Sequence, residues 1–258
     1  MGIKTNKIRI SAEGPYPPEA YAVLAKAEAG HWWFEARNRI IIWALRNKVH
    51  RFESFLEIGC GTGFVLQAVS HTFPDARIYG SEYHLRGLYH AKRRVPTGEF
   101  RQLDATKLDE VECYDAIGAF DVIEHIKADK LVINNLCRAL RHSGSLILTV
   151  PQHPLLWSPA DDYAHHIRRY IRSNIIQLLE EAGLEVTYAT SFVTLLLPLM
   201  IFQRWRSRNK PYNPADEFEI HPWLNKILAK VMELEYLLVR HGLSLPAGGS
   251  LLLIAKRP

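Results

Sequence analysis

The sequence predicts an α/β protein built on a seven-stranded, mostly parallel sheet with helices on both faces. Short apolar runs alternate with amphipathic segments over much of the chain, which is the pattern of parallel strands joined by helices. The first apolar run ends in a glycine-rich turn at 59–63, as expected where a strand passes into a helix. Two further strand-like runs, 184–192 and 249–256, follow a long polar loop and are expected to complete the sheet.

The N-terminal segment is expected to precede the sheet. Residues 1–18 are rich in Gly and Pro and predict an irregular arm. From 19 to 49 the pattern is helical with a break near Gly30, and it holds the aromatic run Trp32-Trp33-Phe34. These rings either pack on the sheet or cover a cofactor cleft. We predict that 1–50 form an arm and helices over that cleft.

The core is predicted at 51–192, where strand-like and helix-like segments alternate and residues that end such segments follow them. Pro74, Ser143-Gly144, Pro151 and Gly183 each stand where a periodic segment ends. The expected strands are 54–59, 76–82, 98–103, 114–120, 145–150 and 184–192. The expected helices are 64–73, 85–95, 128–142 and 173–182, and the polar loop covers 151–170.

A helical insertion is predicted at 193–246, before the final strand within 247–258. Residues 192–202 are apolar apart from Thr194, too short a run for a bilayer span of about 20 residues. Trp205 and a group of cations follow, namely Arg204, Arg206, Arg208 and Lys210. Such a helix suits a lipid headgroup layer. Alternatively, it forms a cap over an acceptor pocket together with a second helix at 222–240.

Composition is ordinary for a globular protein, with 48% hydrophobic and 23% charged residues and a net charge of +5. The cations are not massed on one segment beyond 204–210, so nucleic acid is not an expected partner. Cys60, Cys113 and Cys137 are far apart, which argues against a disulfide framework or a zinc site. The first residues lack the apolar core of a signal peptide. We expect a cytoplasmic protein, with contact at the inner membrane surface as an open alternative.

The glycine-rich turn is the strongest local signal. Glycines at a strand-to-helix turn let a ligand approach the backbone without meeting a Cβ atom. A nicotinamide-dinucleotide motif would require glycine at position 64, where the chain has Phe64. The next strand ends in Glu82, and a carboxylate there accepts hydrogen bonds from ribose hydroxyls. An adenosine-containing ligand is expected, and a nicotinamide oxidoreductase is disfavoured.

At these residues the chain resembles the class I S-adenosylmethionine (SAM)-dependent methyltransferases, which implies a Rossmann-like fold and SAM as cofactor. The segment Glu57-x-Gly59-x-Gly61-x-Gly63 is similar to the family's first motif. The segment 120–125 resembles the fourth-strand motif of quinone-biosynthesis methyltransferases. An upstream arginine is implied as a ligand of the SAM carboxylate, and by spacing this is Arg39, with Arg37 as the alternative. The implied cofactor-binding residues are Arg39, Glu57, Gly59, Cys60, Gly61, Gly63, Glu82, Tyr83, Asp104, Ala105, Phe120 and Asp121.

The polar loop is expected to serve the acceptor. Its segments 157–161 and 166–170 are similar to a bacterial and archaeal methyltransferase subgroup linked to glycan or lipid pathways. The resemblance implies a small-molecule or lipid-linked acceptor. Transfer to an oxygen is favoured, whereas transfer to carbon or nitrogen, or a non-catalytic SAM-binding scaffold at a membrane, remains an alternative.

An oxygen acceptor loses a proton, and His166 is the preferred base, with His125 as a second candidate. The predicted acceptor-binding residues are His153, Arg168, Arg169 and Tyr170. The two arginines would either clamp an anionic group or form salt bridges with Asp161 or Asp162. The loop has no metal-ligand spacing, and we expect no metal site.

Overall fold

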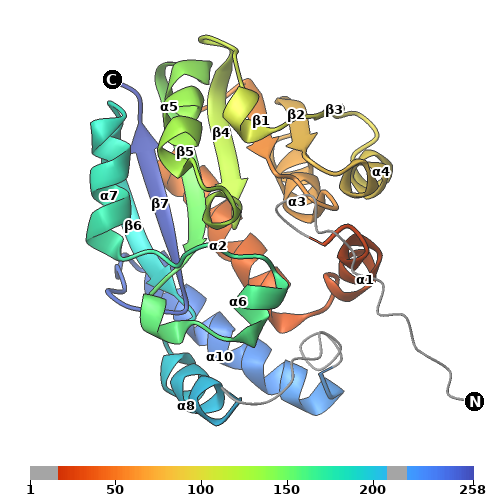
Figure 1. The fold of residues 1–258 in the computed structure, drawn as a ribbon, viewed down its shortest axis with the longest axis vertical. Coiled ribbons are helices and arrows are strands. Elements are labelled where there is room, and N and C mark those ends of the chain that lie inside the picture. Colours follow the sequence, from red (N-terminus) through yellow and green to blue (C-terminus); the bar gives the residue numbers. More distant parts are fainter. Residues whose placement is uncertain (1–16, 208–219) are drawn as a thin grey trace, which may run out of the picture.

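The computed structural model describes residues 17–207 and 220–258, and its centre is a single seven-stranded sheet (Figure 1). The strand order is β3-β2-β1-β4-β5-β7-β6. The strands are β1 (Ser54–Ile58), β2 (Arg77–Glu82), β3 (Glu99–Gln102), β4 (Tyr114–Phe120), β5 (Leu140–Pro151), β6 (Glu185–Phe192) and β7 (Ser250–Lys256).

The first five strands are parallel, and β7 runs antiparallel to both β5 and β6. The order of the strands changes direction between β1 and β4. On one side of β1 the sheet continues with β2 and β3, and on its other side β1 pairs with β4. Open sheets bind ligands at such a reversal, beyond the carboxyl ends of the strands. The predicted fold class is confirmed.

Helices cover both faces of the sheet. One face packs against α2 (Trp32–Lys48), α3 (Phe64–Thr72), α4 (Leu85–Arg94) and α10 (Pro222–Arg240). The other packs against α5 (Asp129–Ala139) and α7 (Arg172–Glu181). The central strand β1 is buried throughout, because its alternate side chains face two different helical layers.

Two local predictions need correction. The helix expected at 128–142 ends at Ala139, and β5 begins at once because Leu140 already pairs with Tyr114 of β4. The polar loop contains a short helix, α6 (Pro159–Tyr163). Ser158 and Asp161 form a capping box at its start, satisfying backbone N–H groups that the first turn leaves open.

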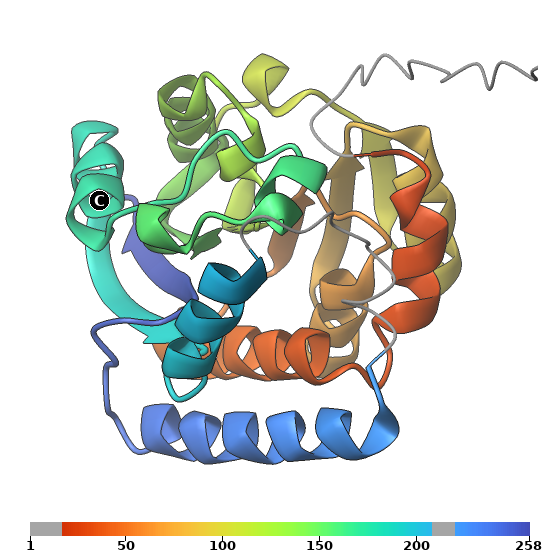
Figure 2. The ribbon, with the colours of Figure 1, turned by 60° about the horizontal axis from the view of Figure 1, so that its bottom comes forward.

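The insertion between β6 and β7 contains α8 (Leu197–Ser207) and α10. Figure 2 shows α10 lying along α2, which it contacts, with α8 nearer the centre of the molecule. None of the helices in ranges 17–207 and 220–258 has the length and apolar character needed to cross a bilayer. Residues 1–16 of the predicted arm, and Arg208 and Lys210 of the cation group, lie outside the described residues.

Candidate active site

A large cavity of about 1460 Å³ lies beyond the carboxyl ends of the central strands. Segments following β1, β2, β4 and β5 line it, together with α1 (Ala20–Ala27), α2, α6 and α8. Ten of the twelve predicted cofactor residues lie in its wall, namely Glu57, Gly59, Cys60, Gly61, Glu82, Tyr83, Asp104, Ala105, Phe120 and Asp121. Gly63 and Arg39 do not.

The three glycines of the turn, Gly59, Gly61 and Gly63, have different surroundings. All three have positive φ values, a conformation that side chains rarely adopt. A Cβ atom on Gly59 would come within 2.6 Å of Val122, and one on Gly63 within 2.8 Å of Ala91 in α4. A Cβ atom on Gly61 would meet only Tyr21, at 3.9 Å. The backbone of Gly61 therefore borders free space of the cavity.

Glu82 ends β2, and its carboxylate joins the glycine-rich turn through Oε2 and α1 through Oε1. It accepts hydrogen bonds from the backbone N–H of Gly61, the N–H of His84 and the hydroxyl of Tyr21, each at 3.0 Å. These donors fix the carboxylate beside the open space at Gly61. Tyr21 lies on α1 and was not anticipated from the sequence, because its position depends on how α1 folds over the turn.

Glu57 lies at the end of β1 and is 2% exposed. Its Oε2 atom has no hydrogen-bond partner among the residues that the structure describes. Burial raises the pKa of this carboxyl well above its usual range, although the charge of Arg37 opposes the rise. A buried, unpaired carboxylate oxygen is costly, so Glu57 is suited to a ligand that brings its own N–H donors.

Arg37, not Arg39, reaches the cavity. Its guanidinium donates to Asp121 Oδ2 at 2.5 Å and stacks on Trp33, 4.6 Å from the ring centroid. Arg39 is exposed, and its guanidinium lies over Tyr236 of α10. The predicted choice of Arg39 is wrong, because two residues along a helix turn the side chain to a different face.

A buried polar cluster ties α1 to the glycine-rich turn. The Thr62 hydroxyl donates to the Glu28 carboxylate at 2.6 Å, and Arg94 of α4 donates to Glu28 at 2.6 Å and to the Ala25 carbonyl at 2.9 Å. Glu28 is only 5% exposed. This cluster could not be predicted from the sequence, since its members come from three separate segments.

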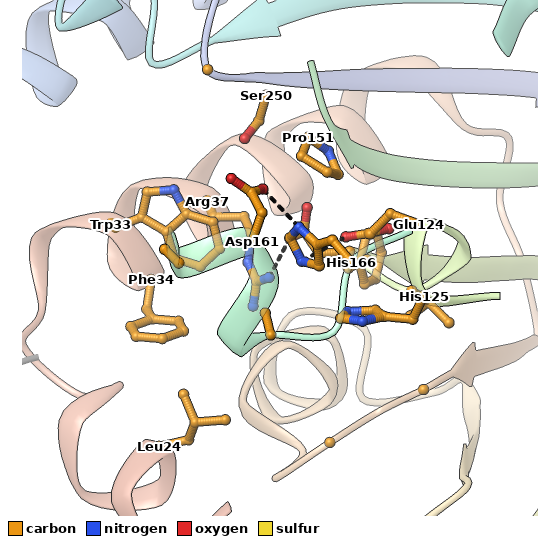
Figure 3. A pocket seen from close by; sticks show the side chains of 18 of the residues that line it. Leu24, Trp33, Phe34, Arg37, Glu124, His125, Pro151, Asp161, His166 and Ser250 are labelled. Atoms are coloured by element: carbon orange, nitrogen blue, oxygen red, sulfur yellow. Dashed lines mark hydrogen bonds and ion pairs between the residues drawn. The ribbon is translucent and has the colours of Figure 1, made fainter. Parts of the chain in front are cut away.

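His166 lies on the cavity wall, oriented by Asp161 (Figure 3). Its Nδ1 atom is 2.8 Å from Asp161 Oδ1, which also accepts from Arg169 Nε at 2.8 Å. Burial opposes ionisation of Asp161, but the hydrogen bond from His166 and the charges of Arg169 and Arg204 lower its pKa. An ionised carboxylate can only accept. Nδ1 of His166 therefore carries the proton, and Nε2 is the nitrogen left with a lone pair.

Glu124 and His125 lie beside His166. Glu124 is fully buried, and neither of its carboxylate oxygens has a hydrogen-bond partner among the described residues. The His125 ring stacks edge-on against His166 at 4.7 Å. Burial, with a smaller contribution from His166, lowers the pKa of His125 to about 3. Glu124 was not predicted as a site residue, although it stands within the 120–125 motif.

Three of the predicted acceptor-binding residues do not line the cavity. The Tyr170 hydroxyl donates to Asp129 at the start of α5, at 2.9 Å, and Arg168 pairs with the same carboxylate. His153 also lies outside the cavity wall. Arg169 does line it, but it is buried in a salt bridge with Asp161. Arg169 thus forms the salt bridge with Asp161 that was the alternative to clamping an anionic group, whereas Arg168 pairs with Asp129, a partner that was not expected.

These residues fit SAM on three observations. The space beside Gly61 admits a ligand against the backbone, and Glu82 offers a fixed carboxylate for a ribose. Glu57 presents an unpaired buried oxygen to a cationic donor such as an α-ammonium group. In addition, Asp104 lies in the cavity wall, where its Oδ1 atom accepts a hydrogen bond from the Thr106 N–H group.

Proteins of similar sequence include SAM-dependent methyltransferases. A "Probable S-adenosylmethionine-dependent methyltransferase" of Mycolicibacterium smegmatis is 26% identical over 160 residues, which are 60% of each chain. The malonyl-[acyl-carrier protein] O-methyltransferase of Bacillus anthracis is 33% identical over 96 residues, 36% of each chain. The chain thus spans less than two thirds of these curated relatives.

Among solved structures, a chain of the complex between the Haloferax volcanii Trm112 methyltransferase activator and its putative methyltransferase has a similar fold. The TM-score is 0.64 at 16% identity, with 93% of this chain and 97% of that chain covered. The model of the methyltransferase domain family matches residues 27–189. The chain therefore belongs to the methyltransferase domain family.

Proposed function

We propose that the protein transfers a methyl group from SAM to an oxygen atom of a small-molecule or lipid-linked acceptor. One observation carries the proposal. The same cavity contains the Gly61–Glu82 cradle, suited to a nucleoside, and the Asp161–His166 pair, suited to proton transfer. Cofactor and acceptor would thus share one cavity.

On this proposal, Gly61, Glu82 and Glu57 hold the cofactor, with Asp104 at its adenine end. SAM supplies a methyl group on a positively charged sulfur, with a neutral thioether as leaving group. The chain's own task is then to align the acceptor and exclude water. Trp33 and Phe34 line the cavity from α2, which favours, of the two alternatives for the aromatic run, the one in which it covers the cleft.

His166 is the proposed base for the acceptor hydroxyl. Its Nδ1–H group is fixed by Asp161, so that Nε2 is available to accept a proton. His125 is less suitable, because an imidazole whose pKa is lowered to about 3 holds a proton poorly near neutral pH. The products are the methyl ether of a hydroxyl acceptor, or the methyl ester of a carboxyl acceptor, together with S-adenosylhomocysteine and a proton passed to solvent.

The outer part of the cavity supports an acceptor with an apolar portion. Leu199 and Phe202 of α8 and Leu224 and Leu228 of α10 line it, which supports the alternative in which these helices form a cap over the acceptor. Arg206 also lines the cavity and would complement an anionic group. Trp205, also on α8, is 73% exposed. We therefore include contact with an anionic lipid surface in the proposal.

The test is transfer of label from methyl-labelled SAM into an extract of cell lipids and small molecules. We expect label in a product whose methyl group is lost under ether or ester cleavage, and none with Gly61→Val. Label resistant to such cleavage would favour a carbon or nitrogen acceptor. Tight SAM binding with repeated absence of label would favour the scaffold alternative. His166→Ala should leave SAM affinity intact and slow transfer.

A further inference from the structure

We propose that Glu124, His125 and His166 together bind a divalent cation in the acceptor half of the cavity. One ligand atom from each of the three residues lies within 4.8 Å of the other two. All three residues line the cavity. This site was not expected from the sequence, because the ligands come from two segments with no short metal-binding spacing between them.

The fold brings these segments together at the carboxyl edge of the sheet. Glu124 and His125 lie on the short 3-10 turn Ile123–His125 directly after β4, and His166 lies on the polar loop after β5. The Ile167 N–H donates to the Glu124 carbonyl at 2.8 Å, which joins the loop to the turn. Figure 3 shows His166 between Asp161 and Glu124, with His125 beside them.

The buried carboxylate of Glu124 is the observation that points to a ligand. Its side chain has no exposed surface, and both oxygens lack a hydrogen-bond partner in the described part of the chain. The nearest cationic candidate, His166 Nε2, is 4.0 Å from Oε1, too far for a hydrogen bond. Buried carboxylates are normally paired or bound to a metal, and a cation between these groups would meet that requirement.

Asp161 provides the outer support that metal-binding histidines usually have. Such histidines donate their second ring N–H to a carboxylate, which fixes the ring and its tautomer. His166 does so through Nδ1, at 2.8 Å from Asp161. Asp161 is held in turn by Ser158, Arg169 and Arg204. Nε2 of His166 is therefore directed toward the Glu124 side by a rigid network.

Two imidazoles and one carboxylate suit zinc or another divalent transition metal rather than calcium or magnesium. Three protein ligands leave at least one coordination position open. Since the site faces the cavity, that position is available to an acceptor oxygen. Bound there, a hydroxyl would lose its proton to solvent more readily, because a divalent cation lowers the pKa of a coordinated oxygen.

This role in catalysis rests on the proposed function, whereas cation binding itself does not. His166 would be a ligand in the loaded protein and a base only in the cation-free protein. Chelation separates the two roles. If transfer persists at full rate after chelation, the cation does not take part, although methyl transfer stands.

The experiment is a titration of the chelator-stripped full chain with Zn²⁺, followed by calorimetry, and with Co²⁺, followed by its visible absorption. We expect one ion per chain, and an intense cobalt spectrum typical of nitrogen ligation at low coordination number. Glu124→Gln, His125→Ala and His166→Ala should each weaken Zn²⁺ binding by at least about tenfold. His90→Ala, a histidine on α4 outside the cavity, is the matched control.

Glu124→Gln keeps the size of the side chain and removes a buried charge, so this variant is expected to fold, as thermal unfolding would verify. Equal Zn²⁺ affinity in the wild type, Glu124→Gln and His166→Ala would overturn the proposal. So would the absence of Zn²⁺ binding by the folded wild type, or an equal loss with His90→Ala. None of these outcomes depends on methyl transfer, which the labelling experiment tests separately.

Discussion

Glu57 and Glu82 show how two similar residues on neighbouring strands acquire different properties. Each ends a parallel strand and each is almost fully buried. Glu82 accepts three hydrogen bonds, whereas Glu57 retains an oxygen without a partner and has a pKa raised by burial. Glu82 is thus fixed by the protein's own donors, whereas on the proposed function the ammonium group of the cofactor would supply the partner that Glu57 lacks.

Replacing Glu57 by Gln should therefore raise the free energy of unfolding and weaken the binding of S-adenosylhomocysteine. The folded protein keeps the Glu57 proton at pH values where the unfolded chain has lost it, because the folded pKa is raised. Wild-type stability attributable to this group falls as pH rises above the ordinary glutamate range toward the raised pKa. Glu57→Gln removes that fall, and we expect a gain of about 1–3 kcal/mol near neutral pH in urea unfolding.

The same variant should bind S-adenosylhomocysteine at least about tenfold more weakly, a difference of about 1.4 kcal/mol, because an amide replaces the anion facing the ammonium group. Glu99→Gln, on the exposed side of β3, is the control for both measurements. A variant with unchanged affinity, or with stability that still declines in step with the wild type, would contradict this role for Glu57.

Glu82→Ala should weaken S-adenosylhomocysteine binding by roughly 1–3 kcal/mol through loss of hydrogen bonds to the ribose. Because Glu82 also holds Tyr21, Tyr21→Phe is the companion variant: it removes the α1 contact and leaves the carboxylate in place. Isothermal titration should show a much smaller loss for Tyr21→Phe. Equal losses would assign the effect to α1 docking instead of the ribose.

At the scale of elements, the turn between β1 and α3 is made of glycines for three separate reasons. Gly59 and Gly63 allow close packing against Val122 and α4, and Gly61 leaves space for a ligand.

Gly61→Val should abolish S-adenosylhomocysteine binding, because its side chain would occupy the free space beside the turn. Gly183 provides a matched control, since it also has positive φ, +85°, and its added Cβ would meet nothing within 4 Å. Gly183→Val should lose stability from backbone strain and retain affinity; if it also lost affinity, strain would explain both results.

The docking of α1 depends on the Glu28–Thr62–Arg94 cluster. Arg94→Met should uncouple α1 from α4, because it removes the salt bridge to Glu28 and the hydrogen bond to Ala25. We expect a loss of about 1–3 kcal/mol in stability and faster amide hydrogen exchange across 20–27. The neighbouring Arg93 instead contacts Tyr89 on the exposed face, so Arg93→Met should leave exchange in α1 unchanged. Unaltered exchange in Arg94→Met would mean that apolar contacts suffice to hold α1.

At the scale of the whole molecule, the insertion gives the cavity an apolar rim. Phe202 is 56% exposed and Trp205 is 73% exposed, and both lie on α8 with Arg206, which lines the cavity together with Phe202. The double variant Phe202→Ser, Trp205→Ser should reduce sedimentation with anionic vesicles by about tenfold or more. Tyr89→Ser, Leu131→Ser removes comparably exposed apolar groups from α4 and α5 and should not. Equal sedimentation of both variants would remove α8 from the proposed lipid contact.

Local pattern was sufficient for most of the fold. Strand and helix signals at Ser54–Ile58, Phe64–Thr72 and Pro222–Arg240 agree with the structure to within one or two residues, because burial on one or two faces imposes a period on the sequence. Helix 128–142 was predicted too long, since pairing between Leu140 and Tyr114 is a non-local contact. Arg39 was chosen over Arg37 by spacing alone, which does not specify the face of a helix.

By itself, the sequence determined the parallel α/β core, the ligand-binding turn and the acid at the end of the next strand, because contiguous residues encode each of these features. Only the tertiary structure decided the partners: Arg37 with Asp121, Glu28 with Arg94, and Glu124 beside His166. Such pairs join segments far apart in the chain, and their chemistry depends on burial and distance. Those quantities exist only once the sheet has brought the carboxyl ends of its strands to one edge.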